Sequence, residues 1–171
     1  MSHQIKIRVA VQEDAEKLLE IQRAVIAEEL YLMTALEEFQ QTVTGQQAWI
    51  QSKLINERET ILVAQFHNEI VGWLMFQSPN RQRLSHTGTF GMMVHKDYRN
   101  HGIGKRLLEE LLEWAMKNPY IKKVGLGVFS TNERAIALYK KMGFVEEGRK
   151  IHEIKINDNE YIDDVLMYKM V

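Results

Sequence analysis

The sequence contains no cysteine among its 171 residues. This absence excludes disulfide bonds, thiolate metal sites and a cysteine nucleophile. A chain without disulfides is compatible with the reducing environment of the cytosol. We therefore predict a cytoplasmic protein.

An excess of charge of one sign and long apolar segments are also lacking. The formal net charge is −1 at pH 7, so the overall charge favours neither nucleic acid nor an anionic membrane as a partner. No apolar run reaches about 18 residues, which argues against a membrane-spanning helix. The first six residues lack the apolar core of a signal peptide. We predict no nucleic-acid partner and no membrane association.

The length and composition predict one soluble domain spanning residues 1–171, with 45% hydrophobic and 26% charged residues. A strand, a helix and a second strand at residues 87–129 form a βαβ unit, whose two strands should be parallel. Hairpins on either side imply antiparallel neighbours. We therefore predict an α/β (α+β) fold, a mixed and mostly antiparallel sheet of about seven strands with helices on both faces. Strands are predicted at residues 5–9, 60–66, 70–77, 87–95, 123–129, 144–156 and 161–170, and helices at 14–30, 46–56, 103–117 and 132–142.

The chain is organised around the junction between a predicted strand and a predicted helix, where Gly102 and Gly104 are separated by one residue. The first N–H groups of a helix have no intrahelical partner, and the peptide dipoles add roughly half a positive charge there. Glycine lets a ligand approach the backbone where a Cβ would collide. The segment from Arg99 to Lys105 is therefore predicted to bind a diphosphate.

Two common phosphate motifs do not fit this segment. A Walker A loop needs a glycine five positions before Gly104 and a Ser or Thr after Lys105, but Arg99 and Arg106 stand there. A dinucleotide fingerprint needs a third glycine where Leu107 stands. The remaining Arg-x-x-Gly-x-Gly pattern is by itself also compatible with an ordinary strand-to-helix turn.

The run from Met92 to Gly104 resembles the acetyl-CoA-binding motif of the GNAT superfamily of N-acetyltransferases. About 30 residues later, Asn132 to Phe144 resembles the second signature of that superfamily, an Asn, an Ala, a Leu-Tyr pair and a Gly-Phe pair. The resemblance implies that an acetyl group passes from acetyl-CoA, the co-substrate, to a primary amine of a small molecule or peptide by direct attack in a ternary complex. The alternative function is a non-catalytic domain that binds or senses acyl-CoA, against which the presence of both Asn132 and Tyr139 argues.

The resemblance also implies a GNAT-like fold in which the two parallel central strands splay apart and the pantetheine arm of the cofactor lies in the gap. The pantetheine arm would form hydrogen bonds with the backbone around Met92, Met93 and Val94. The cofactor-binding residues that it implies are Met92, Met93, Val94, Arg99, Asn100, His101, Gly102, Ile103, Gly104, Lys105, Asn132 and Tyr139.

Tyr139 stands at the position of the superfamily's usual proton donor and is the predicted catalytic residue. A tyrosine has a pKa near 10, so it is protonated at neutral pH and can give its proton to a departing thiolate. A core aromatic is the alternative reading. Asn132 matches the residue that contacts the cofactor arm, although it could be a plain turn or N-cap residue. Ser130 or Thr131 could then cap the helix that contains Tyr139.

The general base is not evident. In the ribosomal-protein alanine acetyltransferases a glutamate lies on the strand before the Asn, but that position here is Gly127, which disfavours N-terminal alanine acetylation. Glu28, Glu29 and His86 are candidate replacements, each better explained as a solvated surface residue. A water chain could also serve.

The sequence leaves the acceptor and the oligomeric state open. The acidic pairs at 28–29 and 37–38 could attract a cationic amine such as a polyamine, or form solvated helix faces. His86, His95 and His101 have no ligand spacing, so we predict no metal site. Apolar residues on both faces of residues 161–170 indicate either a strand covered on both sides or a homodimer contact.

Overall fold

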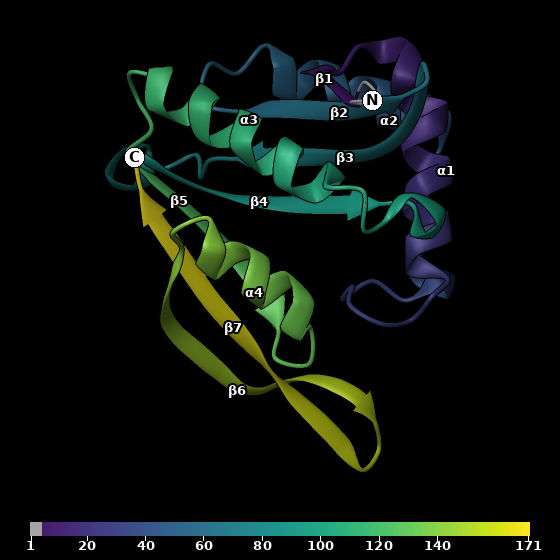
Figure 1. Cartoon of the computed structure of the whole chain (residues 1–171), viewed down its shortest axis with the longest axis vertical. Helices are drawn as coiled ribbons and strands as arrows, with labels where there is room; N and C mark the ends of the chain where they lie inside the picture. Colours follow the sequence, from purple (N-terminus) through teal and green to yellow (C-terminus); the bar gives the residue numbers. More distant parts are fainter. Residues whose placement is uncertain (1–4) are drawn as a thin grey trace.

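The computed structural model describes residues 5–171, which contain one sheet of seven strands and four α-helices (Figure 1). The start of the segment considered for a signal peptide, residues 1–4, lies outside the described residues. No helix within residues 5–171 is long and apolar enough to span a membrane, and the cytoplasmic location stays a prediction. The strands are β1 (Ile5–Val9), β2 (Thr60–Phe66), β3 (Glu69–Gln77), β4 (Thr87–Val94), β5 (Lys123–Phe129), β6 (Val145–Asn157) and β7 (Glu160–Met170). The helices are α1 (Ala15–Ile26), α2 (Val43–Leu54), α3 (Ile103–Lys117) and α4 (Glu133–Lys141).

The strand order is β1-β2-β3-β4-β5-β7-β6. Within residues 5–171, β4 and β5 pair parallel and all other neighbours pair antiparallel. This sheet confirms the predicted mixed α/β fold. Two helix boundaries differ from the prediction by three residues or more. α1 ends at Ile26, shortly before the chain turns at Glu29, whose φ of 53° is left-handed. α2 begins at Val43, because the Thr42 side chain accepts a hydrogen bond from the Gly45 amide at 3.1 Å.

The helices cover both faces of the sheet, as predicted. α3 and α4 lie in front of the sheet in Figure 1 and pack against alternate residues of the central strands. α1 and α2 pack against residues one position out of phase, because successive side chains of a strand point to opposite faces. The first core includes Leu62, Leu74, Phe76, Leu107, Leu108, Leu111, Leu126 and Tyr139, and the second includes Leu18, Ile21, Ile50, Ile61, Val63 and Trp73.

The two parallel strands diverge after a short contact. β4 and β5 pair only from Thr87 with Lys123 to Thr89 with Gly125. Beyond that last pair, β4 continues to pair with β3 as far as Val94, and β5 continues to pair with β7. The second half of β4 therefore has an open edge on the side of β5, which confirms the predicted splay. Figure 1 shows the two strands separating toward the start of α3.

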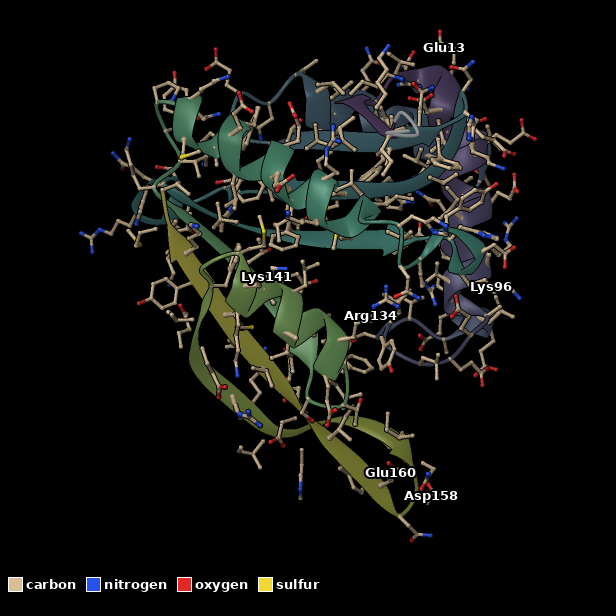
Figure 2. All side chains as sticks on the ribbon, viewed as in Figure 1. Glu13, Lys96, Arg134, Lys141, Asp158 and Glu160 are labelled. Atoms are coloured by element: carbon tan, nitrogen blue, oxygen red, sulfur yellow. The ribbon has the colours of Figure 1, made fainter. Side chains whose placement is uncertain are left out.

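β6 and β7 form a long hairpin that projects beyond the rest of the sheet (Figure 1). Asp158 and Glu160 lie at its tip (Figure 2). β7 itself lies between β5 and β6, and its Val165 and Met167 are buried, whereas Tyr161 near its start is 45% exposed. Most of β7 is thus covered within the chain, and the homodimer stays a prediction.

Candidate active site

The loop between β4 and α3 is shaped by two residues in the left-handed conformation. Asn100 has a φ of 66° and Gly102 a φ of 77°. Glycine adopts this conformation at little cost, and asparagine tolerates it better than most residues. The two residues turn the chain so that Gly102 becomes the N-cap of α3, and the helix begins at Ile103.

Three N–H groups at the start of α3 are available to a ligand. The first intrahelical hydrogen bond joins the Arg106 amide to the Gly102 carbonyl at 3.0 Å. Among residues 5–171, nothing accepts a hydrogen bond from the amides of Ile103, Gly104 or Lys105. These amides lie at the positive end of a helix of 15 residues, which is the arrangement that binds phosphate groups.

Gly104 keeps space open between three elements. A Cβ built at this position would lie 3.3 Å from the Cε of Met92 on β4 and 3.7 Å from Leu138 on α4. The start of α3, the open edge of β4 and α4 therefore meet on one face of the sheet. The structure thus brings together residues of the first signature, Met92 and Gly104, and the helix α4 of the second signature.

Arg99, which the sequence predicts to bind the cofactor, forms hydrogen bonds within the chain. Its guanidinium donates to both carboxylate oxygens of Glu28 at 2.7 and 2.6 Å, and its Nε donates to the Val94 carbonyl at 3.0 Å. The side chain thus ties the loop to the segment after α1. Direct contact between Arg99 and the cofactor stays a prediction.

The same ion pair makes Glu28 a poor candidate for the general base. Hydrogen bonding from Arg99 holds the pKa of the Glu28 carboxyl below its ordinary value, which weakens it as a proton acceptor. His86 is also poorly placed, because it is exposed and precedes β4 at the end opposite the loop, with its carbonyl bonded to the Lys122 amide at 2.8 Å. The structure therefore disfavours both residues as the general base.

The remaining polar residues of the loop have local roles. The Nδ1 of His101 lies 2.8 Å from the Arg99 carbonyl and 3.1 Å from that of Tyr98, so it donates to them and holds the ring against the loop. Lys105 lies near Glu109 at 3.4 Å on an exposed face of α3. Within residues 5–171, no three His, Asp or Glu side chains are grouped to hold a metal ion.

Tyr139 lies on α4 and is only 9% exposed. Its ring packs against those of Phe90 on β4 and Phe144, with centroids 5.7 and 6.1 Å away. Its hydroxyl makes no hydrogen bond with any residue in the described part of the chain. Burial raises the pKa of Tyr139 to about 12, so the hydroxyl stays protonated at neutral pH and can act as a proton donor.

Asn132 is the N-cap of α4, which corrects the prediction that Ser130 or Thr131 caps this helix. Its Oδ1 accepts a hydrogen bond from the Ala135 amide at 3.2 Å. Ser130 instead accepts one from the Asp163 amide at 3.2 Å. Because the Nδ2 of Asn132 has no partner among residues 5–171, the residue can cap the helix and still donate to a ligand.

A pocket of about 540 Å³ opens on the other face of the sheet, between α1, α2 and the central strands. It reaches β4 at Gly91 and Met93, in the part of that strand with the open edge. Its wall contains three aromatic rings and one carboxylate, that of Glu38, and no lysine or arginine. The lining residues are Gln22, Glu38, Phe39, Gln40, Gln41, Gln46, Trp49, Trp73, Met75, Gly91 and Met93.

Sequence reasoning missed Asp164, on β7. This residue is 4% exposed, and neither carboxylate oxygen forms a hydrogen bond or ion pair with residues 5–171. The carboxylate lies over Gly127 on β5, where a built Cβ would be 2.9 Å from Oδ1 and 3.3 Å from Oδ2. Burial raises the pKa of Asp164. A carboxylate from the neighbouring strand thus lies beside Gly127, the position at which the ribosomal-protein alanine acetyltransferases have a glutamate.

Comparison with known sequences gives a consistent result. The Acetyltransferase (GNAT) family matches residues 24–144. The L-amino acid N-acetyltransferase AaaT of Escherichia coli K12 is 32% identical over 109 residues, which are 64% of this chain and 67% of that protein. A spermidine N(1)-acetyltransferase of Vibrio cholerae is 28% identical over 85 residues, 50% of this chain and 49% of that protein.

Solved structures share the fold over nearly the whole chain. An acetyltransferase of the GNAT family from Streptococcus pneumoniae superposes with a TM-score of 0.93 and 28% identity, covering 98% of this chain and 100% of that one. The putative acetyltransferase yncA from Salmonella typhimurium, solved with its cofactor acetyl-CoA, gives a TM-score of 0.87 at 18% identity, covering 98% of this chain and 94% of that one. At that identity the second match supports the fold alone.

Proposed function

Because the chain belongs to the GNAT family and is an acyl-CoA-dependent N-acetyltransferase, we propose that it transfers an acetyl group from acetyl-CoA to a primary amine. The acceptor is the amine of a small molecule or peptide, and one domain spanning residues 1–171 carries the activity. One observation carries the proposal. The free amides of α3, the open edge of β4 and the buried hydroxyl of Tyr139 lie on the same face of the sheet.

The residues that would hold acetyl-CoA fit its two polar parts. The amides of Ile103, Gly104 and Lys105 would donate to the diphosphate oxygens. The His95 amide donates to the Val71 carbonyl on β3 at 2.9 Å, and successive residues of a strand direct their backbone groups to opposite edges. The backbone groups of Met92 therefore face the open edge, where they can bond the amides of the pantetheine arm.

Acetyl-CoA supplies the thioester carbonyl when bound. Tyr139 would donate its hydroxyl proton to the sulfur, and the free Nδ2 of Asn132 would bond the end of the cofactor arm nearest α4. Both residues belong to α4, whose first turn is fixed by the Asn132 cap. The same short helix therefore positions the proton donor and a cofactor contact.

We place the acceptor in the pocket on the α1 and α2 face, because it reaches the open part of β4 at Gly91. A Cβ built at Gly91 meets no atom within 4 Å, so the acceptor has room to approach the strand. The aromatic wall suits an apolar or flat portion of the acceptor, and Glu38 suits a cationic group. The relatives named for L-amino acids and for spermidine support a small-molecule amine of one of these two kinds.

The test is a screen of amino acids, polyamines and short peptides with acetyl-CoA, in which released thiol is measured and the acetylated product is identified by mass spectrometry. Calorimetry with CoA and acetyl-CoA measures binding separately. Amine-dependent thiol release with tight CoA binding is the expected result. Binding without turnover on any amine would favour the acyl-CoA-sensing alternative, and the absence of binding at millimolar CoA would refute the proposal.

A further inference from the structure

Asp164 is a buried carboxylate that no residue of the described chain satisfies. It is 4% exposed, its Oδ1 is fully buried, and neither oxygen accepts a hydrogen bond. A buried, unpaired carboxylate is unfavourable for folding, so it is retained in a protein chiefly where it serves a ligand or a reaction. Its neighbour Asp163 shows the ordinary case, because its carboxylate accepts the His152 amide at 2.9 Å.

Gly127 is what allows the Asp164 carboxylate to lie where it does. Any side chain at position 127 would place its Cβ 2.9 Å from Oδ1, closer than carbon and oxygen can pack. Gly127 is itself exposed, so the carboxylate borders a part of the sheet that is open to solvent. The two residues therefore act as a matched pair, a glycine on β5 and an acid on β7.

This pair lies on the same face of the sheet as the pocket. Thr89 and Gly125 are directly paired, and the next residues on that face are Gly91 on β4 and Gly127 on β5. Gly91 is in the pocket wall, and the Asp164 carboxylate packs over Gly127. Each of the two glycines is two residues beyond the last parallel pair, so they lie on opposite sides of the start of the splay.

We propose that Asp164 is the catalytic base of the transferase, and that it accepts a proton from the acceptor's ammonium group at the start of the splay between β4 and β5. This inference rests on the proposed function. The Asp164 carboxylate reaches from β7 to the side of Gly127, the position at which the ribosomal-protein alanine acetyltransferases have a glutamate. This placement explains why position 127 is glycine in this chain.

The proton transfers balance with one acid and one base. The ammonium gives a proton to Asp164, and the nitrogen lone pair forms a C–N bond to the thioester carbonyl carbon. The C–S bond breaks, its electron pair stays on sulfur, and Tyr139 protonates that sulfur. The nitrogen then loses a second proton, which passes through water to the Tyr139 phenolate and restores its hydroxyl. Asp164 releases its proton to solvent, so one acetylamide, one free CoA and one proton are formed.

The surroundings of Asp164 suit a proton acceptor. Burial, the largest effect, raises its pKa, and Glu153 on β6 adds to this, whereas Lys150, its register partner on β6, opposes it. The neighbouring residues on β5, Gly127 and Phe129, carry no charge. A raised pKa makes the carboxylate a stronger proton acceptor.

The first test compares Asp164→Asn with Asp163→Asn, the same change at the adjacent residue of β7. Turnover of the best acceptor by Asp164→Asn should fall at least about a hundredfold, as for other positioned bases, with CoA affinity within a few fold of native. Asp163→Asn should keep native turnover. Native turnover in Asp164→Asn, or a loss of CoA binding that accompanies its loss of turnover, would overturn the proposal.

A swap of the carboxylate between strands gives the second test. Gly127→Glu alone should impair the protein, because the new side chain collides with Asp164. Asp164→Ala removes the collision and the base together. The double variant Asp164→Ala/Gly127→Glu should recover at least tenfold of the turnover that Asp164→Ala loses, because a carboxylate then stands again beside the splay. Such recovery is not expected if Asp164 merely supports the fold.

Thermal stability provides a readout that needs no acceptor. The raised pKa of Asp164 means that the ionised carboxylate opposes folding above that pKa, and that this penalty disappears as the pH falls toward the ordinary value of 3.8. Asp164→Asn should therefore melt at a higher temperature than native at pH 7. An unchanged or lower melting temperature would overturn the inference even if no acceptor were found, which separates its failure from that of the proposed function.

Discussion

Replacing Tyr139 with Phe removes one oxygen from the candidate active site and leaves the packing in place. The ring contacts with Phe90 and Phe144, at centroid distances of 5.7 and 6.1 Å, do not involve the hydroxyl. Because the hydroxyl has no hydrogen-bond partner among residues 5–171, its loss breaks no bond. We expect the free energy of unfolding to change by less than about 1 kcal/mol.

The expected effect on turnover follows from the pKa of the donor. Burial raises the pKa of Tyr139 to about 12, whereas a thiol has a pKa of about 8.5. A complete proton transfer to the thiolate is then uphill by roughly 5 kcal/mol, so the hydroxyl assists mainly while the C–S bond is breaking. We therefore expect kcat to fall about a hundredfold, near the lower end of the range for positioned acids, or about 2.7 kcal/mol in activation free energy.

The assay is steady-state thiol release with a good acceptor, combined with calorimetry for CoA. The Kd for CoA should stay within a few fold of native, which assigns the loss to the chemical step. Tyr120→Phe serves as the control, because Tyr120 is 48% exposed and carries the same substitution away from α4. If Tyr139→Phe turned over at the native rate, the residue would be a packing residue and the proton would come from water or the substrate ammonium.

Three further changes test other parts of the site and surface. Gly104→Asp should weaken CoA binding more than tenfold in calorimetry, because a carboxylate would face the diphosphate; undiminished binding would place the diphosphate elsewhere. Glu28→Gln should cost about 1 kcal/mol in urea unfolding at pH 7. The depressed pKa of Glu28 means that this difference should shrink as the pH falls below 4.5 and disappear below the still lower pKa of the folded state, and its persistence in strong acid would contradict the ion-pair account. Light scattering at micromolar concentration tests the two readings of residues 161–170. A monomer means that the strand is covered within the chain, whereas a dimer that Ile151→Lys, at a 67% exposed position on the hairpin, converts to monomer would establish the homodimer contact.

The sheet and helices could be predicted because their signals are local. Alternating apolar residues mark β1, and an apolar stripe at helical spacing marks α3, so each element can be found without knowing its neighbours. The parallel pairing of β4 and β5 follows from their connection through a helix. The end of α1 was missed because the residues after Ile26 remain compatible with a helix, and only the left-handed turn at Glu29 ends it.

In the candidate site, too, features formed by neighbouring residues could be predicted, and contacts between distant residues could not. The spacing of Gly102 and Gly104 identified the start of α3, because the backbone that they shape is contiguous in the sequence. The partner of Arg99 could not be read, since Glu28 lies 71 residues earlier and the two meet only after α1 packs on the sheet. The sequence motif marks Arg99 without distinguishing a residue that contacts the ligand from one that fixes the loop.

Gly127 illustrates why a missing motif residue does not mean a missing chemical group. The ribosomal-protein alanine acetyltransferases have a glutamate at this backbone position, but proton transfer requires only a carboxylate oxygen at the right point in space. The register of β5 against β7, with Phe129 opposite Asp164, brings such an oxygen to within 2.9 Å of where the Cβ of residue 127 would be. That register depends on where β7 begins and on the irregular pairing with β6, which no local pattern encodes. The glycine at position 127 and the buried Asp164, which has no partner among residues 5–171, are therefore a single structural feature, visible only once both strands are in place.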